Sequence, residues 1–452
     1  MDPVHLNLSK MDQFLGIGGL PERTRGLVKL FFYMFMFIMS VEGMGTTFVI
    51  LHYVQIFGFA DAAVLMSIVF GVLFLTDYPS GSLGDYIGQR VVLTIALLSF
   101  GVGYTIISQF ESFLSFAVAS VFFGLALGQL SGALETWLDN NYKKTVNDSD
   151  PDNKIYGFAM ARITTLTNFT FAISFVIGGV ISSLISRQFL FLLVAILIIL
   201  IIPIIIKYVK DIDDSDIILE DINISESKNF FVYLKGGFKH LFSSKKSFTL
   251  LMGFAIIDSI SSLWFVLILF PLYFGYTGSD VGVGILRSFV WIIGGFLIIY
   301  AATLSKRVSN NRIGILYFVV KVGLYLGVIA IIDFIPLNDS FQLQGIILLV
   351  LLLVSNQFFG TIALTIRKRI LLETTPSEFR NSIYSLISTI ATLVQLSVMI
   401  YVGKIIELES LSSGLWIMII VSLIGIGLLF IHDYFSETKL EKMQQPVPIE
   451  FG

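Results

Sequence analysis

The chain has 452 residues, of which 56% are hydrophobic and only 13% are charged, and its mean hydropathy is +0.87. Soluble domains carry about 25% charged residues, and a soluble protein of this composition would expose large apolar patches. The composition therefore excludes an ordinary soluble enzyme and an extended nucleic-acid-binding protein. Because the chain has no cysteine, disulfides, thiolate metal sites and thiol catalysis are excluded as well.

Twelve apolar runs are long enough to cross a bilayer, which takes about 20 residues of helix. Six of them precede a central polar stretch and six follow it. The predicted spans are 27–56, 62–83, 91–109, 113–138, 157–184, 188–209, 248–274, 282–304, 313–334, 343–366, 379–403 and 412–433. The fold class predicted from these runs is an all-α polytopic membrane protein with 12 transmembrane helices.

The placement of basic residues tests this count, because cytoplasmic loops are enriched in Lys and Arg. With a cytoplasmic N-terminus, most of the 29 basic residues fall on the cytoplasmic side. Only Arg187 and Lys404 fall on the opposite side, and Arg162, Arg287 and Lys321 fall inside spans. We therefore predict that both termini are cytoplasmic. The first 25 residues show no pattern of a cleavable signal peptide.

The spans divide the chain into five predicted parts. These are a cytoplasmic N-terminal segment (1–26), an N-terminal six-helix bundle (27–209), a cytoplasmic linker (210–247), a C-terminal six-helix bundle (248–433) and a cytoplasmic tail (434–452). In the linker, aromatic and leucine residues recur at helical spacing from Phe230 to Phe242 beside several lysines. This pattern predicts a helix on the inner membrane surface, and a plain tether is the alternative.

The segment between the second and third spans carries a motif. It reads Gly81-Ser-Leu83-Gly84-Asp85-Tyr86-Ile-Gly88-Gln89-Arg90. It resembles the signature loop of the major facilitator superfamily, in which glycines permit a tight turn and the aspartate accepts hydrogen bonds from a neighbouring cation. The resemblance assigns the loop to Gly81, Leu83, Asp85, Gly88 and Arg90, whereas Tyr86 and Gln89 replace basic residues of the family.

The resemblance extends over nearly the whole chain. Residues 302–307 stand where a second, degenerate signature loop belongs, and residues 376–382 resemble the family's turn before the eleventh span. The resemblance implies the major facilitator fold, with two six-helix bundles and a substrate site near the bilayer midplane between them.

One segment resembles a branch of the family. Ser131, Gly132, Glu135 and Asp139 follow the spacing of a segment seen in drug-efflux-like and related members. Gly124 stands about where many proton-coupled members carry an arginine. Ser174 and Phe175 also replace the Gly-Pro of the antiporter motif, and these departures count against drug–proton antiport.

Two carboxylates lie inside spans that the resemblance places at the central cavity. Glu42 is near the middle of the first span, and Asp258 is about ten residues into the seventh. An ionisable group in hydrocarbon costs about 2.5–3.5 kcal/mol and is a functional candidate by default. We predict that Glu42, with Asp258 as a second candidate, takes up and releases a proton or cation. A structural hydrogen bond to a neighbouring helix is the alternative.

Polar and flexible residues near the span centres are candidates for the substrate cavity. They are Met39, Gln129, Ser355, Asn356 and Gln357. Amides can orient a polar ligand or hold helices together, and Met39 lies in a Met- and aromatic-rich run that suits an adaptable apolar pocket or plain packing. Arg287 and Lys321 could attract an anionic substrate, and snorkelling to the surface is the alternative for Arg287.

A third group lies near the cytoplasmic ends of the spans. Glu135 and Arg162 are each about one turn inside adjacent spans, which predicts an ion pair between them. In the family's architecture Asp85 and Arg380 are close by. Together these four residues are interpreted as an inner gate, with a purely structural staple as the alternative.

We therefore predict a monomeric secondary transporter in the plasma membrane that moves a small organic molecule by alternating access. We expect it to use protons and no cofactor or metal, and to export amphipathic or drug-like molecules. The alternatives are a facilitator or symporter for a small polar nutrient, a non-transporting membrane sensor and a polytopic membrane enzyme. The four histidines are scattered and form no metal-ligand pattern, and no Walker loop is present for ATP-driven transport.

Overall fold

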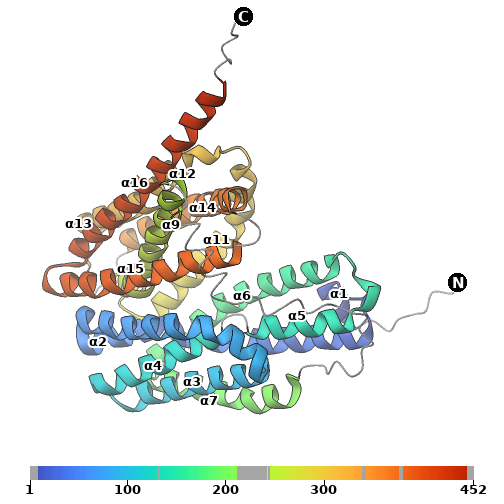
Figure 1. The fold of residues 1–452 in the computed structure, drawn as a ribbon. Coiled ribbons are helices and arrows are strands. Elements are labelled where there is room, and N and C mark those ends of the chain that lie inside the picture. Colours follow the sequence, from blue (N-terminus) through green and yellow to red (C-terminus); the bar gives the residue numbers. More distant parts are fainter. Residues whose placement is uncertain are drawn as a thin grey trace, which may run out of the picture. The chain divides into compact units, whose positions relative to one another are not determined.

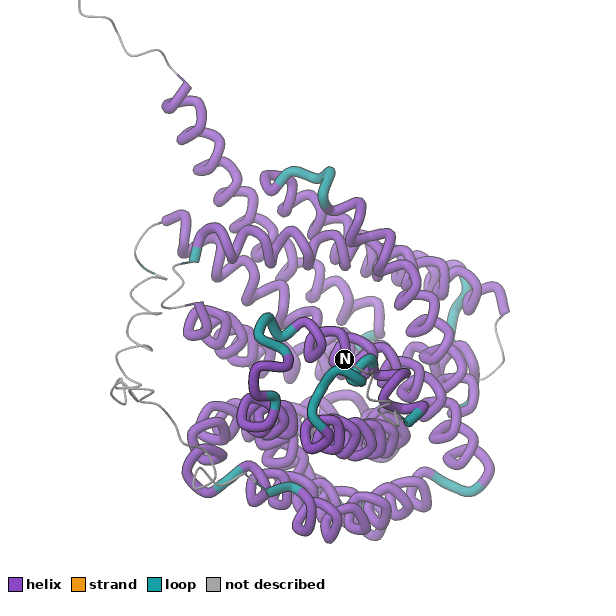
Figure 2. Tube along the Cα trace, turned by 90° about the vertical axis from the view of Figure 1, so that its right-hand side faces the viewer, coloured by secondary structure: helices purple, strands orange, loops and turns teal. Residues whose placement is uncertain are grey.

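The computed structural model describes residues 9–130, 133–210, 242, 245–337, 343–375 and 380–444. These residues form helices joined by short loops, with no strand among them (Figure 1, Figure 2). The α-helices are α1 (Lys10–Leu15), α2 (Glu22–Ile87), α3 (Gln89–Gln109), α4 (Phe113–Leu130), α5 (Ala133–Thr145), α6 (Lys154–Leu184), α7 (Arg187–Tyr208), α9 (Lys245–Leu263), α10 (Leu269–Thr277), α11 (Asp280–Ser305), α12 (Ile313–Tyr317), α13 (Gly323–Phe334), α14 (Leu343–Thr374), α15 (Arg380–Leu408) and α16 (Leu411–Gln444).

Eleven helical segments of the described chain are long and apolar enough to cross a membrane. They follow the predicted spans closely, except that the first, Glu22–Thr76, covers both of the first two. The prediction of an all-helical polytopic membrane protein is confirmed. The exact number of twelve spans and the cytoplasmic placement of the termini stay predictions, and the helix predicted in the linker lies outside the described residues apart from Phe242.

Helix α2 is broken at Gly58, between the first two predicted spans. Gly58 has a φ of 81° and a ψ of −179°, a backbone conformation that favours glycine. Just beyond it, the Ala60 N–H donates to the Oε2 atom of Glu407 at 2.7 Å. The first N–H groups of a helix lack intrahelical partners, so the carboxylate from α15 caps the second part of α2. The single long helix therefore consists of two helical segments.

Contacts group the chain into two compact units. Unit 1 comprises Met1–His52, Ile68–Asn223 and Ser279–Ile292, and unit 2 comprises Tyr53–Ser67, Ile224–Gly278 and Ile293–Gly452, counted over the described residues. The first half of α11 thus groups with unit 1, and the stretch of α2 that follows His52 groups with unit 2. The domain boundaries expected from the sequence stay a prediction.

The interior of unit 1 is aromatic. Helix α3 packs against α4 and α7, and the Tyr104 ring meets Phe123 edge-on with 4.9 Å between centroids. His52 lies 5.5 Å from the Phe116 ring and 5.2 Å from the Phe191 ring, measured between centroids. Buried aromatic pairs of this kind favour offset and edge-on arrangements. This packing fixes α2 beside α4 and α7.

In unit 2, helix α9 packs against α15 and α16. Two of its membrane-length helices contain π-helical turns, η3 (Trp264–Ile268) and η5 (Phe318–Val322). Trp264 is the first residue of η3, and Tyr325 lies in α13 just after η5. The centroids of their rings are 5.7 Å apart. Single π-helical turns are rare and occur frequently at functional sites.

Candidate transport site

Glu42 lines a cavity of about 250 Å³ within unit 1. Helices α2, α4 and α5 supply its wall, which consists of Phe35, Ile38, Met39, Glu42, Leu127, Leu130, Leu134 and Glu135. Two carboxylates therefore face a surface that is otherwise apolar. The Thr46 hydroxyl donates to the backbone carbonyl of Glu42, and in the described part of the chain no side chain forms a hydrogen bond or ion pair with the Glu42 carboxylate.

A cation from α11 acts on Glu42 without pairing with it. Arg287, in the part of α11 that groups with unit 1, interacts electrostatically with Glu42. Its Nη1 atom donates to the Thr47 hydroxyl, and its guanidinium carbon lies 3.7 Å from the centroid of the Phe175 ring. Arg287 is 9% exposed, so it is held inside unit 1 and does not snorkel.

The predicted polar substrate residues have different surroundings. Gln129 on α4 and Asn356 on α14 are half-buried, and each has a buried side-chain oxygen without a hydrogen-bond partner in the described structure. Gln357 packs against Gly294 of α11 so closely that a Cβ atom there would overlap it. Ser355 is exposed. Gln129 and Asn356 thus each keep a buried oxygen that can accept a hydrogen bond.

The second predicted carboxylate, Asp258, is fully engaged in unit 2. Arg367 of α14 donates from Nη1 to Oδ1 at 2.5 Å and from Nη2 to Oδ2 at 2.7 Å. The guanidinium also lies 4.8 Å from the centroid of the Phe254 ring. In the sequence Arg367 opens the basic run Arg367-Lys368-Arg369, and no local pattern connects it with Asp258. A two-point pair of this kind is among the stronger hydrogen-bonded contacts in proteins.

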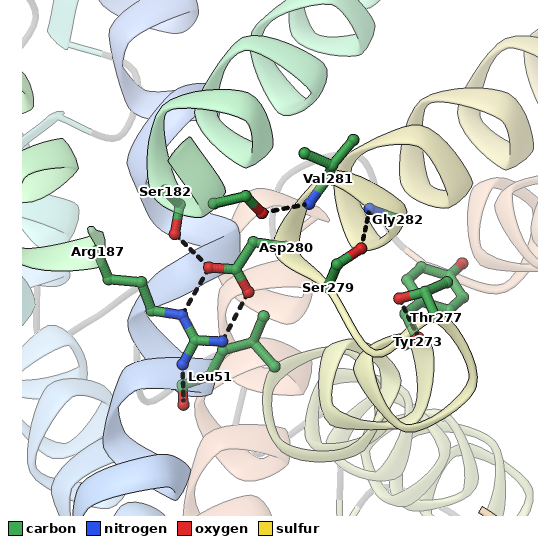
Figure 3. Close-up of polar contacts among 10 residues, drawn as sticks. Leu51, Ser182, Arg187, Tyr273, Thr277, Ser279, Asp280, Val281 and Gly282 are labelled. Carbon is green, nitrogen blue, oxygen red and sulfur yellow. Dashed lines mark hydrogen bonds and ion pairs between the residues drawn. The ribbon is translucent and has the colours of Figure 1, made fainter. Parts of the chain in front are cut away.

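A second buried ion pair joins the first residues of α7 and α11 (Figure 3). Arg187 donates from Nε to Asp280 Oδ2 at 2.8 Å, from Nη2 to Oδ1 at 2.6 Å, and from Nη1 to the Leu51 carbonyl at 2.9 Å. The Ser182 hydroxyl donates to the same carboxylate. Sequence analysis missed this pair. Arg187 was one of only two basic residues on the side predicted to be poor in positive charge, and this unusual position was the sequence feature that could have indicated a buried partner.

The ion pair predicted between Glu135 and Arg162 is not formed among the described residues. Arg162 of α6 donates to the backbone carbonyls of Gln13 and Phe14, at 3.3 Å in the first case, and its guanidinium carbon lies 4.2 Å from the centroid of the Phe158 ring. The last carbonyls of a helix lack intrahelical partners, so the end of α1 attracts the arginine. Glu135 instead lines the Glu42 cavity.

Most of the predicted signature loop is helical. Gly81, Leu83 and Asp85 lie in the last turns of α2, and the turn itself is confined to Gly88, which has a φ of 87° before α3. Arg90 is exposed on α3. The side chains of residues 81–86 and of Arg380, the first residue of α15, lie outside the described part of the structure, so the inner gate stays a prediction.

Membrane-length helices with intramembrane carboxylates beside a cavity are features of a polytopic membrane transporter. The family follows from the sequence, because residues 30–340 match the model of the Major Facilitator Superfamily. The match covers more than half of the chain, which therefore belongs to this superfamily. The predicted family is confirmed, and the chain is a secondary transporter and multi-pass membrane protein rather than an enzyme.

Solved structures share the fold. The crystal structure of the nucleoside transporter NupG matches with a TM-score of 0.70 and 12% identity over 91% of this chain and 99% of that one. A bacterial homologue of the human lysosomal transporter Spinster, in an inward-facing and unoccupied conformation, matches with a TM-score of 0.69 and 12% identity over 94% and 99%. No curated protein sequence matches. At this identity the likeness shows the fold alone.

Proposed function

We propose that the chain is a proton-coupled transporter that moves a small organic molecule across the plasma membrane by alternating access, and that Glu42 carries the proton. The observation behind this proposal is the Glu42 carboxylate, which lines an otherwise largely apolar cavity and has no hydrogen-bond or ion-pair partner among the described side chains. A carboxylate in that position can bind and release a proton without first breaking another contact. Asp258 is the weaker candidate, because Arg367 already occupies both of its oxygens.

The surroundings of Glu42 offer a link between proton binding and conformation. Arg287 interacts electrostatically with Glu42 and is attached to Thr47 and Phe175 of unit 1. When Glu42 takes up a proton, Arg287 loses its attraction to a negative charge. The attraction between the first half of α11 and Glu42 is therefore weaker when Glu42 is protonated than when it is ionised. A ligand shifts a conformational equilibrium only through such a difference in interaction.

Export of an amphipathic or drug-like molecule is the proposed direction and substrate class. The wall of the Glu42 cavity supports it, because Met39, Phe35 and three leucines form a largely apolar surface. Flexible methionine and flat aromatic side chains adapt to ligands of different shape. The segment that resembles the drug-efflux-like branch, from Ser131 to Asp139, includes the two cavity residues Leu134 and Glu135.

A second candidate is import of a small polar nutrient. Gln129 and Asn356 support it, because each carries a buried side-chain oxygen without a partner, and such an oxygen can accept a hydrogen bond from a hydroxyl or amine of a ligand. NupG is described as a nucleoside transporter, and a nucleoside belongs to this polar class. Uptake into intact cells distinguishes this candidate from export.

The test uses inside-out membrane vesicles that contain the protein, an internal pH dye and an imposed proton gradient. Organic cations, drugs, nucleosides, sugars and organic anions are added one class at a time. We expect one class to trigger proton movement, and we expect Glu42→Gln to abolish that movement. Glu409→Gln is the matched control, because it makes the same chemical change at an exposed glutamate.

Two outcomes contradict the proposal. Flux of a labelled compound without proton movement would indicate a facilitator or a different coupling ion. Proton movement that persists in Glu42→Gln would remove Glu42 from the coupling step.

A further inference from the structure

Unit 2 contains a cavity of about 210 Å³, whose wall shares no residue with that of the Glu42 cavity. The start of α9, the end of α14 and the later part of α16 supply this wall. Its polar residues are Lys246, Ser247, Thr374, Thr375 and His432, and two leucines of α9 complete it. The cavity is thus mainly polar, unlike the Glu42 cavity.

The cavity lies at the ends of three membrane-length helical segments. Lys246 is the second residue of one such segment, Thr374 is the last residue of another, and His432 lies two residues before the end of a third. The ends of segments that cross the hydrocarbon core reach the headgroup region of a bilayer. The phosphate groups of lipids are therefore concentrated at the level of this cavity.

Lys246 gives the cavity a positive charge. It is half-buried, and its ammonium forms no hydrogen bond or ion pair with any described side chain. Asp433, the residue after His432, is not part of the wall. Its Oδ1 atom lies 3.3 Å from Nδ1 of the His432 ring. The charge of Lys246, with three hydrogen-bond donors on its ammonium, is therefore available to a ligand.

Thr375 gives the cavity a buried hydrogen-bond donor. The residue is 5% exposed, and its hydroxyl forms no hydrogen bond with any described residue. The neighbouring Thr374 hydroxyl donates to the Ile370 carbonyl at 2.7 Å, so its hydrogen is already used. A hydroxyl with so little access to water is stabilised by a ligand oxygen that accepts its hydrogen.

The helix ends at the cavity also favour an anion. The first N–H groups of a helix have no partner within the helix, and this end favours negative charge and binds phosphate readily. Lys246 lies in the first turn of α9, a helix of 19 residues. The last carbonyls of α14 would oppose an anion. Those of Ile370 and Leu371, however, already accept hydrogen bonds from the Thr374 hydroxyl and the Thr375 N–H.

The size of the cavity selects a small group. Sites for drug-sized ligands have volumes of about 300–1,000 Å³, and this cavity of about 210 Å³ is smaller than that range. A phosphate group is small enough, and its charged oxygens form strong hydrogen bonds with ammonium groups. Basic pockets between membrane helices bind the headgroups of anionic lipids.

We propose that this cavity binds a phosphate group, with the Lys246 ammonium as its charge partner and the Thr375 hydroxyl as a second hydrogen-bond donor. The group belongs to an anionic phospholipid of the membrane or to a free phosphate compound, and the two sources share this chemistry. Binding there connects the ends of α9, α14 and α16 and stabilises the folded state. The site is separate from the proposed proton-coupling residue Glu42 and does not depend on it.

The experiment measures the thermal unfolding of the purified full-length chain in detergent by tryptophan fluorescence, at constant ionic strength. One arm compares phosphatidic acid with diacylglycerol of the same acyl chains, which lacks the phosphate. The other arm compares glycerol 3-phosphate and inorganic phosphate with glycerol. We expect a phosphate-bearing probe to raise the Tm by a few degrees above its phosphate-free partner, because a ligand that binds only the folded state stabilises it.

The two arms identify the source of the phosphate group. A higher Tm with phosphatidic acid alone assigns the site to a lipid headgroup, whereas a higher Tm with glycerol 3-phosphate or inorganic phosphate assigns it to free phosphate compounds. The proposal is overturned if no phosphate-bearing probe exceeds its partner.

Two adjacent lysines test the assignment to the cavity. We expect Lys246→Gln to raise the half-saturating concentration of the stabilising probe about tenfold, because a hydrogen bond to a charged group is lost. Lys245→Gln is the matched control, because it removes the same charge from an exposed residue outside the wall and is expected to leave that concentration unchanged. Equal effects of the two variants would show attraction to the surface charge alone and would overturn the proposal.

A measurement on the wild type covers the case in which Lys246→Gln does not fold. Acylation of lysines by a small N-hydroxysuccinimide ester is followed by peptide mass spectrometry, with and without the stabilising probe. We expect the probe to slow the modification of Lys246 more than that of Lys245, and an equal change at both residues overturns the proposal. Both measurements detect binding rather than proton flux, so Glu42→Gln is expected to keep the phosphate-dependent Tm shift.

Discussion

Arg187 binds both carboxylate oxygens of Asp280, and the two side chains are only 9% and 7% exposed. The pair connects the first residue of α7 with the first residue of α11 (Figure 3). The Ser182 hydroxyl donates a further hydrogen bond to Asp280, and the Leu51 carbonyl accepts one from Arg187. A buried ion pair contributes most when its remaining donors and acceptors are satisfied in this way, and here it attaches the first half of α11 to unit 1.

The first prediction follows from the burial of this pair. Asp280→Asn leaves the Arg187 guanidinium buried without a counter-charge, and breaking a buried pair on one side costs about 3–5 kcal/mol. We expect a lower free energy of unfolding of that order, measured by denaturant unfolding of the purified protein. Asp152→Asn is the control, because the Lys154–Asp152 pair has the same 2.6 Å distance with side chains 80% and 65% exposed.

Exposed pairs contribute about 0–1 kcal/mol, so the control variant is expected to unfold almost like the wild type. Equal losses in Asp280→Asn and Asp152→Asn would contradict the role assigned to burial.

The positions of the membrane helices could be predicted from the sequence. The predicted span 91–109 became α3 (Gln89–Gln109), and 188–209 became α7 (Arg187–Tyr208). The bilayer demands a long apolar run, so hydropathy alone locates such helices within a few residues. The break at Gly58 fell where the first two predicted spans are separated, although its cap by Glu407 was not expected.

The pairing of side chains could not be predicted. Asp258 and Arg367 are 109 residues apart, and no local spacing relates them. Counting basic residues assigns Arg367 to a side of the membrane and does not identify its partner. Arg162 shows the reverse case. The predicted spans placed it near Glu135, whereas in the structure it binds the backbone carbonyls of Gln13 and Phe14 in the docked helix α1. Such choices depend on tertiary packing.

The second prediction concerns the break in α2. Gly58→Ala puts a side chain on a residue with a φ of 81°, and a Cβ atom there would lie 2.6 Å from Glu407 Oε2. A φ of 81° with a ψ of −179° is a conformation that essentially only glycine adopts, and it costs another residue about 1–3 kcal/mol. We therefore expect a lower Tm. Gly71→Ala in the same helix has no neighbour within 4 Å of the added Cβ and is expected to raise stability slightly; a Tm loss as large as that of Gly58→Ala would contradict this account.

The third prediction is a pH dependence that comes from Asp12, in the segment before the first span. Burial acts to raise the pKa of Asp12, but hydrogen bonds from Lys29 and Ser9 outweigh it and hold the pKa below its ordinary value. Lys29 lies 3.0 Å from Oδ1, and the Ser9 N–H lies 3.0 Å from Oδ2. The ionised carboxylate therefore stabilises the folded state.

A carboxyl group whose pKa is lowered on folding contributes fully above its unfolded pKa of about 3.9 and loses that contribution as the pH falls through the folded pKa. We expect Asp12→Asn to unfold more easily than the wild type at pH 6, and the gap between their Tm values to shrink below about pH 4. Asp152→Asn, at an exposed aspartate, is expected to show no gap at either pH. A gap for Asp12→Asn that is unchanged down to pH 3 would contradict the prediction.

The last prediction tests the contact between α6 and the first half of α11. A Cβ atom on Gly179 of α6 would lie 2.5 Å from the Asp280 backbone carbonyl, and one on Gly284 of α11 would overlap the carbonyl of Phe175. Backbone atoms of packed helices cannot move aside as a flexible side chain can. Overpacking typically costs about 1–3 kcal/mol, so we expect both Gly179→Ala and Gly284→Ala to lower the Tm.

Each of these helices offers its own control. Gly157 on α6 and Gly295 on α11 have no neighbour within 4 Å of an added Cβ, and alanine in place of an unhindered helical glycine gains about 0.5–1 kcal/mol. We therefore expect opposite signs within each helix, with destabilisation at the contact and slight stabilisation away from it. If all four variants shifted the Tm in the same direction, helix propensity rather than the contact would govern the result. The contact between α6 and α11 would then contribute less to stability than the close approach of their backbones implies.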